Sequence, residues 1–417
     1  MGVKVYFKTV GCRVNQVETQ SLAEKFRALG YEPADRPEDA AVVVVNSCSV
    51  TEYADRDTLN FIKKTVKDNP KGRLVVTGCL ATLEPARILE LAPGAALFSN
   101  SDKEKIPYSI AGTEPKGDFF RITGFRGRTR AFVKIQDGCD LKCAYCLVPA
   151  ARNILKSKPC GAVLAEIRGL ITAGFGEIVL CGTRLGMYKC GETGRNLGTL
   201  MPEIFRLEGD FRIRFSSLEP GEVSEELAAV LKSGGEKFCG YFHLPLQAGS
   251  DAVLRAMRRP YDTAGYFRKL EILRRHFCGP GLFADVIAGY PSETEEQFAE
   301  TLAFVEKCRF AGLHVFRFSG RPGTTASSLK PLDRKTVAAR ASALRALDVR
   351  LRGAYAASML GQKLRVLILR NKGGAASGLA ANFLGVSMAC ANKPGSFAEA
   401  KVTGVLPGGG CFGRIFP

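Results

Sequence analysis

The chain has 417 residues, of which 46% are hydrophobic and 24% are charged, a composition typical of two or three globular domains in water. No run of about 18 apolar residues occurs, which argues against a membrane-spanning helix. The first residues lack the apolar core of a secretory signal, so we expect a cytoplasmic protein. The formal charge of +18 favours a polyanionic partner, nucleic acid before an anionic membrane surface, over a merely solvated basic surface.

Cysteine is the most informative residue type, with 14 copies in the chain. In a reducing compartment, clustered cysteines indicate metal or redox chemistry more often than disulfides. The chain holds only three histidines, so a histidine-rich metal site is not expected.

Residues 1–115 are predicted to form a doubly wound α/β domain around a parallel sheet. Short strands are expected within residues 3–10, 40–47 and 72–78, where continuous apolar runs suit a sheet that is covered on both faces. A first helix is expected to contain Thr19 to Leu29 and to stop at Gly30.

Residues 116–130 are predicted to be a linker, because this stretch is rich in glycine and lacks apolar periodicity. Two interpretations of the linker stay open, a solvated connector and a strap that faces a polyanion. The second rests on four arginines with no acid between them, which are Arg121, Arg126, Arg128 and Arg130.

Residues 131–332 repeat a strand-then-helix rhythm. The six candidate strands are residues 131–136, 177–182, 211–217, 240–245, 282–289 and 312–319. This rhythm predicts a partial parallel barrel of the TIM type, (β/α)6, with functional residues at the carboxyl ends of its strands. The spacing of Ser292 and Glu295 matches a capping box and predicts that a helix starts directly after Pro291.

The last third of the chain is predicted to contain a long helix and a small β module. A connecting helix is expected over residues 333–360, with Leu344, Leu347 and Leu351 on one side. Residues 361–417 alternate short strands with Gly and Asn turns and carry seven Lys or Arg against one acid, Glu399. We expect a small basic β-barrel, a type of module that often binds nucleic acid.

Cys139, Cys143 and Cys146 form a C-x3-C-x2-C motif directly after a predicted strand. On a helix this spacing would be one buried face, but the pair Asp137-Gly138 in front of it favours a loop. Structural zinc normally takes four ligands, whereas three thiolates suit a four-iron cluster with one iron open to a cofactor. The motif therefore predicts a redox-active iron–sulfur centre.

Cys12, Cys48 and Cys79 each follow one of the three predicted N-terminal strands. Because the carboxyl ends of parallel strands meet at one edge of a sheet, we expect the three thiols to converge there. The alternative is three unrelated core cysteines. Convergence predicts a second three-cysteine iron–sulfur cluster, while the remaining cysteines show no ligand spacing and are interpreted as packing thiols.

The C-x3-C-x2-C motif, with Tyr145 before its last cysteine, resembles the signature of radical S-adenosylmethionine enzymes. Together with the N-terminal triad and the basic C-terminal module (TRAM-like), it makes the whole chain resemble the methylthiotransferases. Collinear stretches that carry the resemblance include VGCRVNQVET, KIQDGCDLKCAYC and DVIAGYPSET. The resemblance implies two [4Fe-4S] clusters, one on each cysteine triad, and S-adenosylmethionine as cofactors.

The resemblance also implies a reaction scheme. The cluster on Cys139, Cys143 and Cys146 cleaves S-adenosylmethionine to a radical that removes hydrogen from C2 of a modified adenine, and the other cluster supplies a methylated sulfur. Contacts to S-adenosylmethionine are expected at the strand ends, where ordinary turn or capping roles are the alternative. The candidates are Tyr145, Gly182, Glu219, Gln247 and Gly289. His243 is expected to be a hydrogen-bonded barrel-end histidine rather than a base.

The stretches GCRVNQ and HVFRFSGRPGT look most like the branch that acts on threonylcarbamoyladenosine beside the tRNA anticodon. The alternatives are isopentenyladenosine in tRNA and, against the basic charge, an aspartate of a ribosomal protein. The implied partners are the anticodon stem-loop and an external electron donor such as flavodoxin or ferredoxin, and we expect a monomer. Asn153 and Lys158 replace the Gly and Arg usual in the family, which bears on substrate contacts and not on the reaction class.

Overall fold

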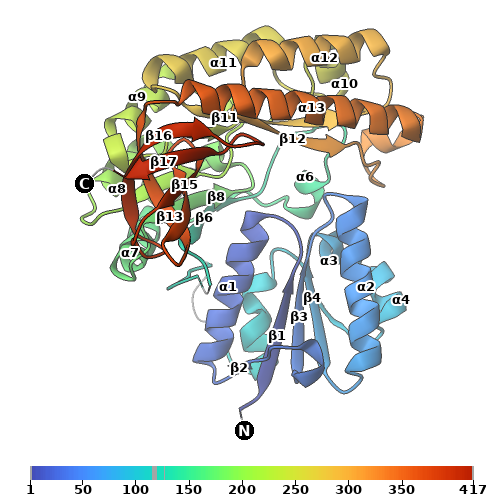
Figure 1. The fold of residues 1–417 in the computed structure, drawn as a ribbon. Coiled ribbons are helices and arrows are strands. Elements are labelled where there is room, and N and C mark those ends of the chain that lie inside the picture. The colour runs from blue at the N-terminus through green and yellow to red at the C-terminus, as the bar shows by residue number, and fades with distance from the viewer. Residues whose placement is uncertain (1, 115–119, 126, 416–417) are drawn as a thin grey trace.

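The computed structural model of the protein describes residues 2–114, 120–125 and 127–415. Its N-terminal part is a parallel sheet with the strand order β2-β1-β3-β4-β5 (Figure 1). The strands are β1 (Lys4–Thr9), β2 (Glu32–Pro33), β3 (Val42–Ser47), β4 (Arg73–Gly78) and β5 (Ala96–Phe98). The three strands expected in this region are confirmed, and the strand order is that of one common doubly wound fold.

Helices cover both faces of this sheet. Successive residues of a strand point to opposite sides, so each apolar strand packs against helices on both faces. On β3, Val44 packs with Phe26, whereas Val45 packs with Ile62 on the other face. The helices are α1 (Arg13–Ala28), α2 (Glu52–Asp68), α3 (Cys79–Leu83), α4 (Pro85–Leu91) and α5 (Ile106–Ala111). The doubly wound prediction is therefore confirmed, and α1 contains the predicted helical stretch from Thr19 as far as Ala28, with Leu29 as its C-cap.

The segment that precedes the barrel is packed, so the solvated connector is the wrong interpretation for its described residues. Phe120, Ile122 and Phe125 are buried, and the backbone N–H of Ile122 donates to the Glu166 carboxylate at 2.9 Å. These apolar side chains follow no helical or strand period, so the sequence pattern does not show that they anchor the segment. Residues 115–119 and Arg126 of the predicted linker lie outside the described residues.

The six strands predicted for the central barrel are all present. They are β6 (Arg130–Asp137), β8 (Glu177–Gly182), β9 (Arg212–Phe215), β10 (Tyr241–His243), β11 (Gly281–Ala288) and β12 (Gly312–Arg317), and β7 (Lys156–Ser157) adds an antiparallel edge to β6. Strands β6, β8 and β9 form one parallel sheet and β10 to β12 another. The two sheets join through the Cys239 N–H, which donates to the Ile213 carbonyl at 2.9 Å. In the described chain β6 and β12 do not pair, so the barrel is partial, as expected.

Helices cover the outer side of the barrel strands, except for α6 (Val148–Ala151), which lies between the barrel and the N-terminal domain in contact with α3 (Figure 1). The other helices of this region are α7 (Cys160–Thr172), α8 (Leu197–Phe205), α9 (Glu225–Ser233), α10 (Asp251–Ala256), α11 (Thr263–His276), α12 (Glu295–Cys308) and α13 (Arg334–Ser358). The long connecting helix is confirmed as α13, which buries Leu344, Leu347 and Leu351. None of the described helices combines the length and apolarity needed to cross a lipid bilayer.

The capping box of α12 lies two residues further along the chain than the sequence predicts. Thr294 and Gln297 form the box, rather than Ser292 and Glu295. Glu293 turns inward, where its carboxylate accepts a hydrogen bond from Arg340 of α13 at 2.8 Å. This inward turn delays the helix, an outcome that depends on a partner 47 positions away in the chain.

The C-terminal strands close into a barrel in the order β13-β14-β15-β17-β16, which confirms the predicted small β-barrel. They are β13 (Lys363–Lys372), β14 (Ala375–Ala380), β15 (Gly385–Ala389), β16 (Phe397–Val405) and β17 (Cys411–Ile415). Val366, Ile368 and Val402 belong to a separate core inside this barrel.

A buried ionic cluster attaches the small barrel to the end of the central barrel at which its strands begin. Glu177 is fully buried and pairs with Arg212 and Arg214, each at 2.8 Å. The same guanidinium groups donate to the carbonyls of Leu379 and Ala381 in the small barrel, at 2.8 and 3.1 Å. Burial opposes ionisation of Glu177, yet the arginines hold its pKa well below the usual range.

Replacing Glu177 by Gln is expected to leave two buried guanidinium groups without their counter-charge and to cost about 3–5 kcal/mol of stability. The measurement is urea unfolding followed by circular dichroism. Glu208→Gln makes the same chemical change at an exposed position and should cost less than about 0.5 kcal/mol. Equal unfolding midpoints for the two variants would contradict the role given to Glu177.

Candidate functional site

The N-terminal triad lies where the strand order of the sheet reverses, between β1 and β3, which is where open α/β sheets place ligands. Cys12 is the N-cap of α1, Cys48 follows β3, and Cys79 is the first residue of α3. The structure brings the three thiols together. Burial, together with the neighbouring Cys79 and Cys12 thiols, raises the pKa of Cys48 to about 12.

Two glycines make the approach of these thiols possible. Gly11 has φ 104°, and a Cβ atom on it would lie 2.6 Å from the Cys48 Cβ. Gly78 has φ 97°, and a Cβ atom there would lie 2.2 Å from the Ser47 carbonyl oxygen. Both conformations are open to glycine and costly for any other residue. The two Gly-Cys pairs therefore turn the chain at the ends of β1 and β4 so that the thiols face a common point.

The second triad occupies the loop between β6 and α6, as predicted. The side chain of Gln136 donates to the carbonyls of Asp137 at 2.9 Å and of Gly138 at 2.8 Å, which fixes the start of the loop. Burial, together with the adjacent Cys143 and Cys139 thiols, raises the pKa of Cys146 to about 12. The three thiols are thus close enough to oppose one another's ionisation.

Both triads have the donor chemistry that an iron–sulfur cluster requires. Crowded thiols stay ionised only beside a cation, and iron supplies that charge. N–H groups already point at the sulfur atoms: Arg259 donates to the Cys143 Sγ at 3.0 Å and Asn100 to the Cys79 Sγ at 3.7 Å. Hydrogen bonds to sulfur tune the potential of such clusters. Each triad offers three protein ligands, which leaves one iron of a four-iron cluster for another ligand.

A buried network of ion pairs and hydrogen bonds connects the parts of the chain that carry the two triads. Arg152 donates to the carboxylates of Glu18 and Asp137 and to the side-chain oxygen of Asn15, each at 2.8 Å. Glu18 also accepts from Lys103 at 2.5 Å and from Lys134 at 2.7 Å. Burial opposes ionisation of Glu18, but these three cations hold its pKa well below the usual range. The network ties α1, which begins at Cys12, to the loop that carries the second triad.

Two of the predicted S-adenosylmethionine contacts lie beside the second triad. Arg259 forms an ion pair with Glu219, approaches the Tyr145 hydroxyl at 3.5 Å and donates to Cys143. Sequence reasoning missed Arg259, because nothing local distinguishes it from Arg258, its neighbour in the chain. Only the fold shows that Arg259 is buried.

Local packing accounts for two of the three other candidates, Gly182 and Gly289. A Cβ atom on Gly182 would lie 2.8 Å from the side-chain oxygen of Gln136, so this glycine makes room for the residue that holds the cysteine loop. Gln247 has φ 70°, a strained conformation of the kind found at functional sites, and its N–H donates to the Asp285 carbonyl at 2.8 Å. A Cβ atom on Gly289 would lie 2.6 Å from Val337 of α13, which is a packing reason for that glycine.

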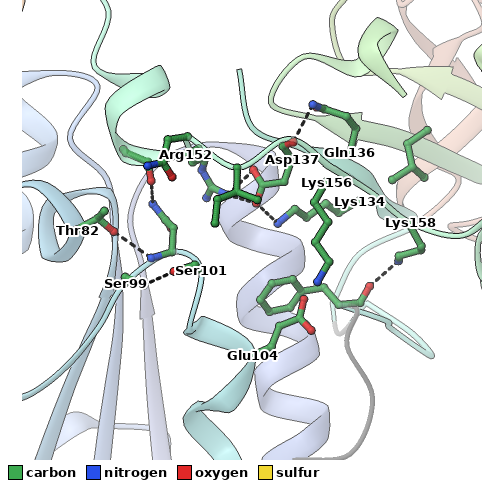
Figure 2. A pocket seen from close by; sticks show the side chains of 16 residues that line it. Thr82, Ser99, Ser101, Glu104, Lys134, Gln136, Asp137, Arg152, Lys156 and Lys158 are labelled. Carbon is green, nitrogen blue, oxygen red and sulfur yellow. Dashed lines mark hydrogen bonds and ion pairs between the residues drawn. The ribbon is translucent and has the colours of Figure 1, made fainter. Parts of the chain in front are cut away.

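A cavity of about 240 Å³ lies between the N-terminal domain and the central barrel (Figure 2). Asn100, which donates to Cys79, and Arg152 both line it. Its cationic side chains outnumber its acids, so it suits an anionic group, and none of the five predicted S-adenosylmethionine contacts lines it. Asn153 lies exposed at this cavity, whereas the Lys158 ammonium is buried in an ion pair with Glu166. Lys158 therefore has a structural role here.

Comparisons with known proteins agree with this arrangement. The model of an uncharacterized protein family, UPF0004, matches residues 4–99, and the model of the radical SAM superfamily matches residues 133–305. The radical S-adenosylmethionine methyltransferase TsrM from Kitasatospora setae has a similar fold, with a TM-score of 0.58 and 13% identity over 78% of this chain and 77% of that one.

Relatives align over most of the chain. The threonylcarbamoyladenosine tRNA methylthiotransferase MtaB of Bacillus subtilis is 34% identical over 87% of this chain and 84% of its own length. The protein of the same name from Aquifex aeolicus is 34% identical over 88% and 93%. The tRNA-2-methylthio-N(6)-dimethylallyladenosine synthase of Geobacter sulfurreducens is 33% identical over 87% and 86%.

Replacing Gly11 by Ala is expected to push Cys48 away from the other two thiols and to lower the iron bound per chain by about half, since one of two predicted clusters is affected. The measurement is iron analysis after anaerobic reconstitution. Gly30→Ala is the matched control, because Gly30 also has a positive φ, 86°, but no atom within 4 Å of the added Cβ. If both variants bind the same amount of iron per chain, crowding at Cys48 does not affect cluster binding.

Proposed function

The chain belongs to the methylthiotransferase family of radical S-adenosylmethionine enzymes, and we propose that it converts threonylcarbamoyladenosine beside the tRNA anticodon into its 2-methylthio derivative. The observation that carries the proposal is the pair of three-cysteine sites held in one frame by the Arg152 network. Four relatives whose names state this substrate are 32–35% identical to the chain.

The side chains around the two triads have separate tasks in this proposal. When bound, the cluster on Cys139, Cys143 and Cys146 supplies the reductive cleavage of S-adenosylmethionine, and the cluster on Cys12, Cys48 and Cys79 supplies the sulfur. Arg259 holds Cys143 and Glu219 in place beside the cofactor. Arg152, together with Glu18 and Asp137, keeps the two triads at a fixed separation, since all of its partners are buried or half-buried.

The small barrel has a surface suited to the phosphates of an anticodon arm. Lys363 of β13 lies opposite Lys401 of β16, and Lys401 lies opposite Arg414 of β17. Like charges directly opposite one another destabilise a sheet, so a row of three cations favours a polyanionic partner. Near the N-terminal triad, Tyr53 is 74% exposed at the start of α2, where it can stack on a base splayed from a single-stranded loop.

Two further parts of the proposal concern partners and substrate. An external one-electron donor is required, because the chain has no flavin or nicotinamide chemistry of its own in the proposed scheme. Dimethylallyladenosine is the second candidate substrate, since relatives named for it align almost as well as the first group, at 33% identity.

Deleting the gene is expected to remove the 2-methylthio group from threonylcarbamoyladenosine in tRNA, as measured by mass spectrometry of tRNA nucleosides. Wild-type protein should restore the group, and Cys48→Ser should not, because it removes a predicted cluster ligand. Cys308→Ser, which changes a buried thiol outside both triads, should restore it. Unchanged nucleosides on deletion would refute the substrate, and loss of the dimethylallyl product instead would redirect it.

Neutralising Lys401 and Arg414 to Gln is expected to weaken binding of an anticodon stem-loop and to reduce the slope of log K against log salt by about 1.5, as two phosphate contacts are lost. Fluorescence anisotropy across a salt series measures both quantities. Lys63→Gln, on α2 of the N-terminal domain, is the control and should leave the slope unchanged. A double variant with the wild-type slope would place the RNA contact elsewhere.

A further inference from the structure

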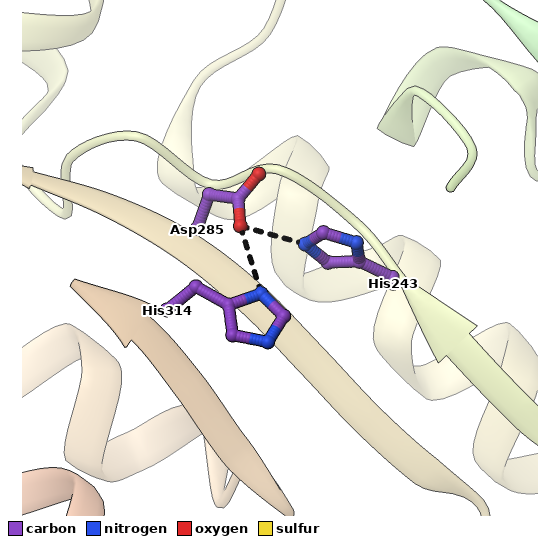
Figure 3. Close-up of side chains that lie close together, drawn as sticks. All are labelled: His243, Asp285 and His314. Atoms are coloured by element: carbon purple, nitrogen blue, oxygen red, sulfur yellow. Dashed lines mark hydrogen bonds and ion pairs between the residues drawn. The ribbon is translucent and has the colours of Figure 1, made fainter. Parts of the chain in front are cut away.

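Two of the three histidines in the chain meet at one carboxylate inside the central barrel (Figure 3). The Nε2 atom of His243 lies 2.7 Å from the Oδ1 atom of Asp285, and the Nδ1 atom of His314 lies 3.1 Å from the same oxygen. The residues come from β10, β11 and β12, and Asp285 is the direct partner of His314 in the strand register. The two imidazole rings are perpendicular, with centroids 4.9 Å apart.

Strand alternation shows that these side chains face the inside of the barrel. On β11, Ala284 and Val286 belong to the core that contains Leu270 of α11 and Leu344 of α13, so they point outward to the helices. Asp285 lies between them and points the other way. The same alternation holds on the two neighbouring strands, where Phe242 and Leu244 flank His243 and Leu313 and Val315 flank His314 in that core.

The ionic partners of Asp285, which is half-buried, differ from those of the buried carboxylates described above. Glu18, Glu177 and Glu293 each pair with at least one ammonium or guanidinium group. Within the described chain, the ionic partners found for Asp285 are the two imidazoles alone. No Lys or Arg side chain is among these ionic partners, so the only charged or ionisable groups paired with Asp285 there are the two imidazoles.

We propose that His243, Asp285 and His314 bind a divalent first-row transition cation inside the barrel, with Zn²⁺ as the probe. Two imidazoles and one carboxylate form a known three-residue ligand set for zinc and for non-haem iron. The three ligand atoms lie within 4.8 Å of one another, a span that one ion with bonds of about 2.1 Å can bridge after small side-chain rotations. The ion would keep open positions directed into the barrel.

This site is separate from the two cysteine triads in both ligand type and strands. Its three ligands are nitrogen and oxygen donors on β10 to β12, whereas the thiols follow β1, β3, β4 and β6. The proposal does not depend on the substrate, so it stands or falls independently of the proposed reaction.

The experiment uses the full chain with its iron–sulfur clusters reconstituted under anaerobic conditions. The protein is treated with a chelator, incubated with Zn²⁺ and desalted, after which zinc and iron are measured by mass spectrometry. We expect about one zinc per chain in addition to cluster iron, and a zinc X-ray absorption spectrum with nitrogen and oxygen neighbours and no sulfur.

Asp285→Asn and His314→Ala are each expected to lose the bound zinc while keeping the iron content. His276→Ala is the matched control, because the His276 Nε2 atom also lies 2.8 Å from a carboxylate, that of Glu225, at an exposed position. The zinc content of this control should match that of the wild type.

Three outcomes would overturn the proposal: less than about a tenth of a zinc per chain in the wild type, sulfur in the zinc shell, or full zinc retention in both variants. The first two are measured on the wild-type protein, so they decide the matter even if a variant fails to fold. His243, Asp285 and His314 would then be a hydrogen-bonded group that holds no metal.

Discussion

The buried contact between Arg152 and the carboxylates of Glu18 and Asp137 is the constraint on which the two-site arrangement depends. Glu18 belongs to the helix that begins at Cys12, and Asp137 ends the strand that leads to Cys139. A guanidinium between two carboxylates presents several donors in a rigid plane, so it fixes direction as well as distance. The network therefore connects the two cysteine triads, which belong to separate folding units, through one set of buried contacts.

The same principle recurs at the other end of the barrel. Glu177 with Arg212 and Arg214 joins the central barrel to carbonyl groups of the small barrel. Burying charge is costly, and the cost is tolerable only when every partner is in place. Both junctions between folding units thus contain a buried ionic cluster. Apolar contacts accompany each cluster: Val14 and Val17 of α1 belong to the core of the central barrel, and Phe383 packs with Tyr241.

The strand-end rule explains why residues distant in the chain form one site. The three N-terminal cysteines, the second triad and Glu219 all follow strands of parallel sheets, and these ends face one another across the two domains (Figure 1). Other groups lie further from this edge along the barrel strands. His243, Asp285 and His314 lie within the strands β10, β11 and β12, and Glu177 lies at the opposite end, where β8 begins.

The sequence by itself determined the fold class, all six barrel strands, the long helix α13, the meeting of Cys12, Cys48 and Cys79 at one sheet edge and the loop that carries the second triad. It could do so because these features follow from local periodicity and from the rule that parallel strands end at one edge. Tertiary structure alone decided the burial of Arg152 and Arg259, the packed segment around Ile122, the capping box at Thr294 and the meeting of His243 with His314. Each of these depends on a partner that is distant in the chain: Arg152 and Glu18 are 134 positions apart and Arg259 and Cys143 are 116 apart. A side chain's charge or ring is visible in the sequence, but its partner becomes known only when the strands and helices are packed.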